Sequence, residues 1–334
     1  MCPYINRMKQ NVECAPLRVL SEDEKFMYRC LQLAVRGRQN AKPNPMVGAV
    51  IVADGRIIGE GYHVRCGEGH AEVNAFASVR PEDEHLLTQS TIYVSLEPCS
   101  HYGKTPPCAD LIVRKGVRRV VVGCIDCFAE VRGRGIERLR RAGIEVTVGV
   151  LEEACKELNK CFFTYHREHR PYVILKWAQT ADGYLDNHGH ALSISTPFTR
   201  MLVHQLRSQV DAIVVGRVTD EREHPRLDVR YWSGNSPLRM VVDHRHPLRM
   251  DSLYAQHVQS LLVEGGARTL QSFMDDGIWD EIRVETAPFT IGGGTPAPSI
   301  PLGAVVSHVD DVDGNRIIFY RNRQEPHPIS ESPI

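Results

Sequence analysis

The sequence lacks the features of several specialised classes of protein. None of its apolar runs approaches the roughly 20 residues of a membrane-spanning helix, and its first 21 residues contain no apolar segment of the kind found in signal peptides. Its ten cysteines are too sparse in 334 residues for a small disulfide framework. We therefore expect a cytoplasmic protein with reduced thiols and no association with a membrane.

An excess of charge of one sign is also lacking. Lys and Arg number 40 and Asp and Glu number 41, which gives a formal net charge of −1. This balance argues against a basic arm for nucleic acid and against a polybasic membrane anchor. The sequence also has no internal repeat and no low-complexity tract, so ordinary globular domains are expected.

The length and composition suit about two domains of ordinary size. Hydrophobic residues make up 42% of the chain and charged residues 24%, which is enough apolar side chain for real cores. A charged stretch closed by Pro171 marks the expected boundary. We expect an irregular extension at 1–20, a first domain at 21–168, a second domain at 171–323 and a disordered tail at 324–334.

Helical and strand patterns alternate through both halves, which predicts an α/β layer architecture with a largely parallel sheet. Ser21 and Glu24 have the spacing of a capping box, and Asp54-Gly55 is a strong hairpin signal. In the first half we expect a hairpin of Val47–Ala53 with Arg56–Glu60, helices at His70–Val79, Cys108–Lys115 and Gly135–Ala142, strands at Thr91–Leu96, Arg119–Cys124 and Glu145–Val150, and a helix from Leu151 that leads into the charged stretch. In the second half we expect strands at Tyr172–Trp177, Ala212–Val215, Leu238–Val242, Ser260–Val263, Glu281–Glu285 and Arg316–Tyr320, and helices at Pro197–Arg207 and Ala267–Met274.

The strongest chemical signal is a set of metal-ligand residues at the starts of predicted helices. His70, Cys99 and Cys108 offer one imidazole and two thiolates, which is the donor set of a catalytic zinc site with an open fourth position. Helix N-termini favour thiolates. Glu72 lies two residues after His70 and is placed to shuttle protons without binding the metal. This pattern is typical of zinc-dependent nucleobase deaminases.

These residues also allow other interpretations. Buried cysteines are common in cores, so Cys99 alone would indicate nothing. A purely structural zinc is disfavoured because no fourth ligand lies beside the three, and Cys124 and Cys127 fit a strand end and loop better than a redox pair. His101 and Lys104, between the two cysteine ligands, would suit a phosphorylated substrate, although for either residue alone an exposed polar loop is the favoured interpretation.

Three segments closely resemble the bifunctional riboflavin-biosynthesis enzymes: Pro43 to Ala49, Gly69 to Ala75 and Ser95 to Cys108. The resemblance extends from about Asp23 to Arg321. That family joins a diaminohydroxyphosphoribosylaminopyrimidine deaminase to a 5-amino-6-(5-phosphoribosylamino)uracil reductase. The resemblance implies a cytidine-deaminase-like α/β/α sandwich with Zn²⁺, followed by a dihydrofolate-reductase-like α/β domain with NADPH.

The resemblance also implies roles for residues of the first domain. Asn44 and His63 would hold the pyrimidine of 2,5-diamino-6-(5-phosphoribosylamino)pyrimidin-4-one, His101 and Lys104 would contact its ribose phosphate, and Glu72 would be the proton shuttle. The partner would be this phosphorylated small molecule, with no nucleic acid, and the protein would form a homo-oligomer.

The second half gives weaker signals by itself. Glycines follow predicted strands at Glu264-Gly265-Gly266 and at Gly292-Gly293-Gly294, which is compatible with a phosphate loop or with ordinary turns. The resemblance implies that NADPH would then reduce the ribosyl chain to ribityl. It places Ala178, Thr219, Glu223, Glu264 and Gly265 on the cofactor side, and Lys176, Ser193, Arg207, Leu227 and Arg230 on the substrate side.

The second half also departs from the family pattern at two places. Glu223-His224 stands before Pro225 where the family usually has aspartate. Only 17 residues separate Asp243 from Leu261, so we expect a strand and a helix that cover the nicotinamide to be missing. These departures predict weak cofactor binding and slow reduction, and they keep open a deaminase with an impaired reductase domain. A nucleic-acid base deaminase and a non-catalytic zinc module are further alternatives; charge opposes the former, and Glu72 the latter.

Overall fold

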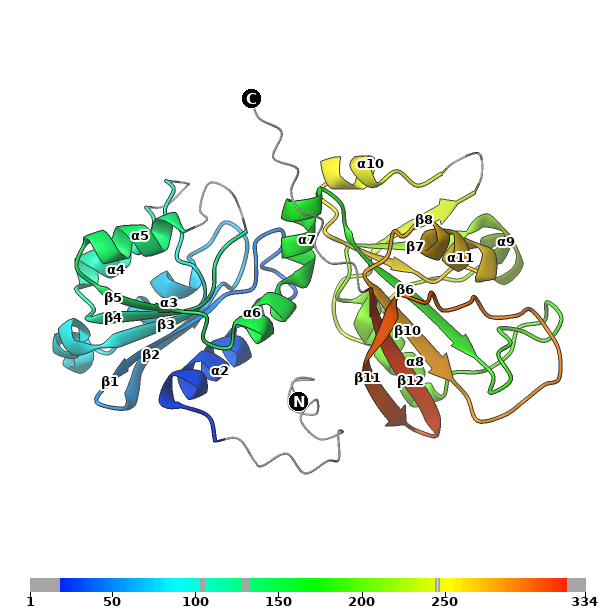
Figure 1. The fold of residues 1–334 in the computed structure, drawn as a ribbon, viewed down its shortest axis with the longest axis horizontal. Coiled ribbons are helices and arrows are strands. Elements are labelled where there is room, and N and C mark those ends of the chain that lie inside the picture. The colour runs from blue at the N-terminus through cyan, green and yellow to red at the C-terminus, as the bar shows by residue number, and fades with distance from the viewer. Residues whose placement is uncertain (1–18, 103–105, 128–132, 244, 246, 323–334) are drawn as a thin grey trace. The chain divides into compact units, whose positions relative to one another are not determined.

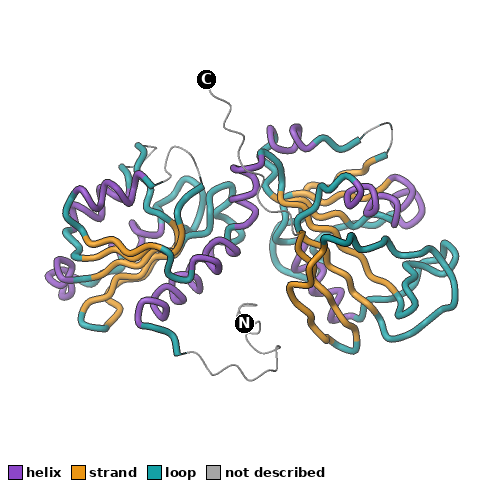
Figure 2. Tube along the Cα trace, in the orientation of Figure 1, coloured by secondary structure: helices purple, strands orange, loops and turns teal. Residues whose placement is uncertain are grey.

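A computed structural model of the chain describes residues 19–102, 106–127, 133–243, 245 and 247–322. The chain divides into two compact units, Met1–His169 and Arg170–Ile334. Each unit contains a sheet with helices packed on it (Figures 1 and 2), which confirms the expected α/β class. Among the residues described, every helix is too short or too polar to span a bilayer.

The first unit is built on a five-stranded sheet in the order β2-β1-β3-β4-β5. The expected hairpin forms around Asp54-Gly55, and both of these residues have positive φ. Strand β1 is antiparallel to β2 and β3, whereas β3, β4 and β5 are mutually parallel neighbours. The strands are β1 (Gly48–Ala53), β2 (Arg56–Tyr62), β3 (Thr91–Leu96), β4 (Arg119–Cys124) and β5 (Glu145–Val148).

Alternate residues of these strands point into two separate hydrophobic layers. Ala49 and Ile51 belong to the layer shared with α3, α4 and α5, and Val50 and Val52 to the layer shared with α2, α6 and α7. The period of two along a strand therefore places helices on both faces of the sheet. The helices are α2 (Glu22–Ala34), α3 (Ala71–Ala77), α4 (Cys108–Lys115), α5 (Arg134–Arg141), α6 (Glu152–Leu158) and α7 (Lys160–Glu168), with 3₁₀ turns at Val35–Gly37 and Pro81–Gln89.

The capping box at the start of α2 is confirmed. The backbone N–H of Glu24 donates to the Ser21 hydroxyl at 3.3 Å, and the Ser21 N–H donates to the Glu24 carboxylate at 2.9 Å. One expectation for this unit is wrong: the segment from Leu151 is two helices, and the charged stretch lies mostly inside the second. The break falls at Asn159, whose side chain bonds both the N–H and the C=O of Met46, at 2.8 and 2.9 Å.

The second unit is built on a seven-stranded sheet in the order β11-β12-β10-β6-β9-β7-β8. Strands β10, β6, β9, β7 and β8 are parallel neighbours, and β12 pairs antiparallel with β10 and β11. The strands are β6 (Tyr172–Gln179), β7 (Ala212–Gly216), β8 (Leu238–Val242), β9 (Ser260–Val263), β10 (Glu281–Thr286), β11 (Ala304–Val312) and β12 (Asn315–Asn322), and the helices are α8 (Pro197–Arg207), α9 (Arg217–Glu223), α10 (Met250–Ala255) and α11 (Ala267–Asp275).

The two faces of this sheet differ in polarity. Leu175 and Trp177 of β6 belong to an apolar core that includes residues of α10 and α11. Lys176, on the opposite face, pairs in register with Arg283 of β10, and both side chains are buried. Glu285 lies further along the same face and accepts hydrogen bonds from Ser195 at 2.7 Å, Thr199 of α8 at 2.5 Å and Asn315 at 2.7 Å. The sheet thus presents buried charge toward α8.

Three elements of the second unit were not predicted: α9, α10 and β11. Helix α10 lies within the short connection after Asp243. The expectation that a strand and a helix covering the nicotinamide are missing stays a prediction. Between β8 and β9 the described residues hold no further strand. Strand β11 is an edge strand with exposed valines and acidic residues, which obscures the alternation that sequence analysis relies on.

Gly61→Ala should destabilise the first unit, because α3 lies directly on the backbone of β2. A Cβ at Gly61 would lie 2.3 Å from Ala75 N and 2.4 Å from Ala71 O. Overpacking of this kind costs about 1–3 kcal/mol, which calorimetry of the full chain would detect as a lower unfolding temperature. Gly303→Ala, where a Cβ meets nothing within 4 Å, is the control. A Gly61→Ala protein as stable as the wild type would contradict the described contact.

Candidate active sites

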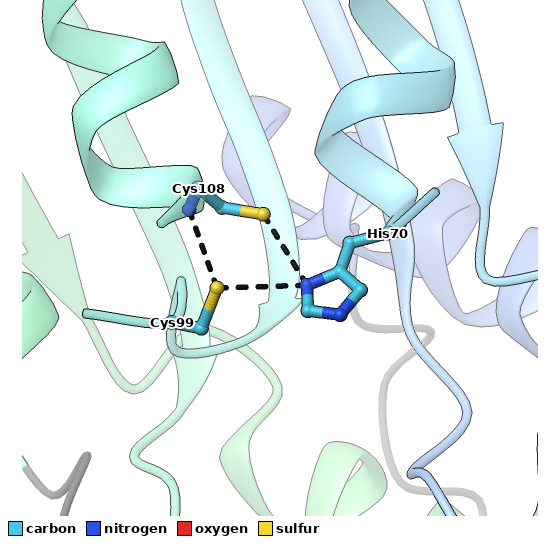
Figure 3. A group of neighbouring side chains, drawn as sticks. All are labelled: His70, Cys99 and Cys108. Atoms are coloured by element: carbon cyan, nitrogen blue, oxygen red, sulfur yellow. Dashed lines mark hydrogen bonds between the residues drawn. The ribbon is translucent and has the colours of Figure 1, made fainter. Parts of the chain in front are cut away.

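His70, Cys99 and Cys108 come together in the first unit (Figure 3). His70 is the N-cap of α3, Cys108 is the first residue of α4, and Cys99 lies in the loop after β3. His70 Nδ1 is 3.5 Å from Cys99 Sγ and 3.4 Å from Cys108 Sγ. Zinc bonds of about 2.1 Å to nitrogen and 2.3 Å to sulfur, meeting at a tetrahedral angle, separate N from S by roughly 3.6 Å. The donor set and its spacing therefore fit a zinc ion.

The cluster already favours a thiolate at Cys99. The Cys108 thiol donates toward Cys99 Sγ, His70 lies beside it, and the backbone N–H of Cys108 donates to it at 3.2 Å. These interactions, led by the Cys108 thiol, lower the pKa of Cys99 to about 4. A thiolate is the form of cysteine that binds a metal.

Glu72 lies in the first turn of α3 and is only 3% exposed. Burial, followed by the negative charge of Cys99, raises the pKa of Glu72 to about 7. Glu72 lies in the turn of α3 that follows the N-cap residue His70, so its carboxyl group belongs to the same site as the metal ligands. A carboxyl that titrates near neutrality can both accept and return a proton.

Asn44 and His63 lie next to the cluster. Asn44 Nδ2 donates to His63 Nε2 at 3.0 Å, and His63 Nδ1 donates to the carbonyl of Gly69 at 3.2 Å. Burial lowers the pKa of His63, so its imidazole is neutral, and these two bonds set its tautomer. The His63 ring meets that of His70 edge-on, with centroids 5.4 Å apart.

The loop between the two cysteine ligands is described only in part. His101 is exposed, and its side chain makes no hydrogen bond or ion pair with another described residue. Lys104 lies outside the described residues. The phosphate contacts expected of these two side chains therefore stay predictions.

Glu97 is a site residue that sequence analysis missed. Its carboxylate accepts the backbone N–H groups of Gly133 and Gly135 at 2.9 Å each, and those of Asp126 and Ile136 at 3.3 and 3.4 Å. It thereby ties the loop that carries Cys99 to the start of α5. The available signal was an acidic residue directly before Pro98-Cys99, and it was not used.

In the second unit, several expected substrate-side residues line one cavity of about 310 Å³. The cavity brings together Lys176, Ala178, Ser193, Arg207 and Arg230. Burial lowers the pKa of Lys176. Arg207 does not stand alone: its Nε and Nη2 donate to both oxygens of Glu264, at 3.0 and 2.7 Å. The structure thus joins a residue expected on the substrate side to one expected on the cofactor side.

The remaining expected residues lie elsewhere in the unit. Thr219 is in the first turn of α9, and a Cβ at Gly266 would lie 2.8 Å from its Oγ1. A Cβ at Gly265 would lie 2.8 Å from Thr269 Cβ, and one at Gly216 would lie 2.3 Å from Thr269 Oγ1. The turns that start α9 and α11 therefore pack closely, with both helix starts at neighbouring strand ends.

Two further expected residues, Leu227 and Glu223, do not line this cavity. Leu227 is buried with a φ of 55°, and it does not line the cavity. Glu223 is the last residue of α9, and burial raises the pKa of its carboxyl.

Comparisons with known proteins agree for the two units. Residues 20–124 match the family described as the cytidine and deoxycytidylate deaminase zinc-binding region, and residues 171–252 and 247–313 match the RibD C-terminal domain. The riboflavin biosynthesis protein RibD of Aquifex aeolicus is 37% identical over 353 residues, covering 90% of this chain and 98% of that protein. RibD of Escherichia coli is 41% identical over 237 residues, covering 66% and 63%.

Solved structures agree with these matches. The Thermotoga maritima diaminohydroxyphosphoribosylaminopyrimidine deaminase/5-amino-6-(5-phosphoribosylamino)uracil reductase is 33% identical, with a TM-score of 0.82 over 90% of this chain and 99% of that one. Acinetobacter baumannii RibD is 28% identical, with a TM-score of 0.79 over 91% and 99%.

The cysteine ligands give a direct test of the metal site. We expect one zinc per chain in the wild type and its loss in the Cys99→Ser, Cys108→Ser double variant, because two of three protein ligands are removed. Cys66→Ser is the matched control, since Cys66 is exposed and outside the cluster. Metal analysis of purified protein measures the outcome. Full zinc content in the double variant would exclude this ligand set.

Proposed function

The chain belongs to the RibD family of bifunctional riboflavin-biosynthesis enzymes, and we propose that each of its units carries out one of that family's two reactions. The first unit deaminates 2,5-diamino-6-(5-phosphoribosylamino)pyrimidin-4-one. The second reduces the ribosyl chain of the deaminated product to ribityl with NADPH. The buried Glu72 beside three zinc-type ligands is the observation that carries the first reaction.

Glu72 is the proton carrier of the deamination. Bound by His70, Cys99 and Cys108, zinc would supply Lewis acidity that lowers the pKa of a water molecule. Glu72 takes a proton from the water whose oxygen bonds to the amine-bearing pyrimidine carbon, and it returns that proton to the amine nitrogen, which leaves as ammonia when the carbon–nitrogen bond breaks. A structural zinc site has no use for an unligated, buried carboxyl group, so this residue also separates the proposal from a non-catalytic zinc module.

The pyrimidine of the substrate is held by side chains whose orientation is fixed by their own hydrogen bonds. Asn44, which is hydrogen-bonded to His63, presents an amide to the pyrimidine, and neutral His63 is kept in one orientation by its bond to Gly69. His101 and Lys104, by the family resemblance, contact the ribose phosphate. The protein is further proposed to be cytoplasmic and homo-oligomeric, with a small-molecule substrate and no nucleic-acid partner.

The second unit offers a place for each ligand of the reduction. Lys176, Ser193, Arg207 and Arg230 line the cavity proposed for the substrate, with buried Leu227 as a supporting residue. Ala178, Thr219, Glu223, Glu264 and Gly265 are the proposed cofactor-side residues. NADPH, when bound, supplies the hydride.

The packed turns of α9 and α11 suit the phosphates of this cofactor. Side chains at Gly216, Gly265 and Gly266 would force the two turns apart. Because these three positions are glycine, the two helix starts lie together. The backbone N–H groups of helix N-termini favour phosphate. The cavity and the close packing of the two turns give no support to the alternative in which the second unit is only structural.

Glu72→Gln should abolish most of the deaminase turnover while the protein keeps its zinc. Glutamine is nearly isosteric but cannot accept and return a proton, and general acid–base catalysis contributes about 10²–10⁴-fold. Ammonia release from the phosphorylated diaminopyrimidine measures the loss. NADPH oxidation with deaminated substrate is the control and should be unchanged. Near wild-type ammonia release would show that Glu72 is not the proton carrier.

Gly266→Ala should weaken NADPH binding. Its Cβ would meet Thr219 Oγ1 at 2.8 Å and separate the turns of α9 and α11. A misfit of about 1–3 kcal/mol corresponds to roughly 5- to 150-fold in KM for NADPH. Steady-state NADPH oxidation measures it, with ammonia release as the internal control. An unchanged KM would place the cofactor phosphates away from these turns.

A further inference from the structure

A buried carboxylate lies behind the cavity wall of the second unit. Glu285 of β10 is fully buried, and it is not one of the residues that line the cavity of about 310 Å³. It pairs in register with Ala178 of β6, and Lys176 lies two residues earlier on the same face of that strand. Both Ala178 and Lys176 line the cavity. Glu285 is therefore a close neighbour of the cavity, and the proposed function leaves it without a role.

The hydrogen bonds of Glu285 fasten one segment of the cavity wall to the sheet. The segment is residues 193–195, which line the cavity consecutively just before α8. Ser195 Oγ donates to one oxygen of Glu285 at 2.7 Å. Asn315 of β12 donates to the other oxygen at 2.7 Å and, through the same nitrogen, to the carbonyl of Ile194 at 3.1 Å. The position of this part of the wall therefore depends on the Glu285 carboxylate.

The three hydrogen-bond donors of Glu285 are neutral groups: the hydroxyls of Ser195 and Thr199 and the amide of Asn315. Within the described part of the chain, no ion pair compensates the Glu285 carboxylate. Burial opposes its ionisation, but the hydrogen bonds, together with the charge of Lys176, outweigh burial and hold the pKa of Glu285 below its usual value. The carboxylate is therefore negatively charged at neutral pH, and its charge acts on its surroundings.

Lys176 is the cation on which this charge acts. Its ammonium group is surrounded by the carboxylates of Glu264 and Glu285 and by the guanidinium groups of Arg207 and Arg283. Burial lowers the pKa of Lys176, as do the two arginines, whereas the two carboxylates raise it. Arg207 already binds both oxygens of Glu264. Glu285 is therefore the carboxylate whose charge remains for Lys176.

Three more titratable groups face the same cavity. Arg200 and His204 of α8 line it, and so does Arg230. Burial lowers the pKa of His204, so its imidazole is neutral, and arginine side chains stay protonated in proteins. Among the residues that line the cavity, Lys176 is therefore the group that titrates in the alkaline range.

We propose that Glu285 is a positioning residue for the reduction: it fastens residues 193–195 to the sheet and supplies the negative charge that keeps Lys176 protonated inside the cavity. The proposal rests on the proposed function of the second unit. A protonated lysine offers a substrate three hydrogen-bond donors and a positive charge, and a neutral amine loses the charge and one donor. Glu285 thus acts on the substrate through its neighbours and not by contact.

Glu285→Gln removes the charge and keeps the shape of the side chain. The glutamine oxygen can accept from Thr199 and Asn315, and its nitrogen can donate to the Ser195 hydroxyl, so residues 193–195 stay in place. Without the negative charge, the pKa of Lys176 should fall by about one unit. The alkaline limb of kcat/KM for the deaminated substrate should then move to lower pH by the same amount, which is about 10-fold in kcat/KM above the limb. NADPH oxidation measured as a function of pH checks the shift.

Glu285→Asp is the complementary variant, because it keeps the charge and shortens the side chain by one methylene group. Its alkaline limb should stay close to that of the wild type. Its KM for the deaminated substrate should rise roughly 2- to 10-fold, because hydrogen bonds to residues 193–195 are lost. Glu281→Gln is the matched control: Glu281 is a buried carboxylate of the same strand, lies 3.6 Å from Arg321 and does not line the cavity. An unshifted limb in Glu285→Gln, or an equal shift in Glu281→Gln, would overturn the proposal.

Calorimetry of the full chain tests the coupling without reductase activity. Glu285→Gln leaves the charge of Lys176 uncompensated, and Lys176→Met leaves that of Glu285 uncompensated, so each should lower the unfolding temperature of the second unit. The double variant removes both charges, and its loss should be smaller than the sum of the two single losses. A double variant that folds where Glu285→Gln does not would show the same coupling, whereas additive losses would overturn the proposal.

The two kinds of measurement separate this proposal from the proposed reduction. Calorimetric coupling in a wild type that does not oxidise NADPH would mean that the reduction fails while the pairing of Glu285 with Lys176 stands. NADPH oxidation by the wild type with additive losses in the variants would mean that the reduction stands and that Glu285 does not act through Lys176.

Discussion

Close backbone approach at glycine positions decides where both sites lie. In the first unit, Gly61 lets α3 lie on β2, and a Cβ at Gly135 would lie 2.0 Å from the carbonyl of Pro98. The first contact places His70 and Glu72, and the second brings the start of α5 to the loop of Cys99, where Glu97 binds its N–H groups. In the second unit, the lack of a Cβ at Gly265 and Gly266 lets the start of α11 lie against the start of α9. Helix starts thus converge on strand ends in both units.

The two units use buried charge differently. In the first unit, the buried carboxyl groups lie apart: Glu72 is beside the metal ligands, Glu97 accepts backbone N–H groups, and Asp83 pairs with Arg56. In the second, buried charges gather on one face of the sheet: Lys176, Arg283 and Glu285 lie there, and Arg207 pairs with Glu264 nearby. Ion pairs keep such a face from being left with uncompensated buried charge.

The sequence was informative where chemistry is local and less so where it depends on pairing. His70, Cys99 and Cys108 are recognisable because His70 and Cys108 stand at helix starts and Cys99 follows Pro98 just after a strand. The ion pair of Arg207 with Glu264 joins residues 57 positions apart, and no pattern along the chain indicates it. Strand β11 was missed because its polar edge hides the alternation, although Asp313-Gly314 gives the same turn signal that revealed the first hairpin, again with positive φ at both residues. Glu97 was missed because its partners, the backbone N–H groups, have no signature in the sequence.

The break between α6 and α7 has a mechanical consequence. Asn159 holds Met46 by both of its backbone groups, and Met46 is two residues from Asn44. The loop that presents Asn44 is therefore fastened to the start of the helix that runs to the end of the first unit at Glu168. Any displacement of the start of α7 relative to the sheet would therefore strain the loop that carries Asn44.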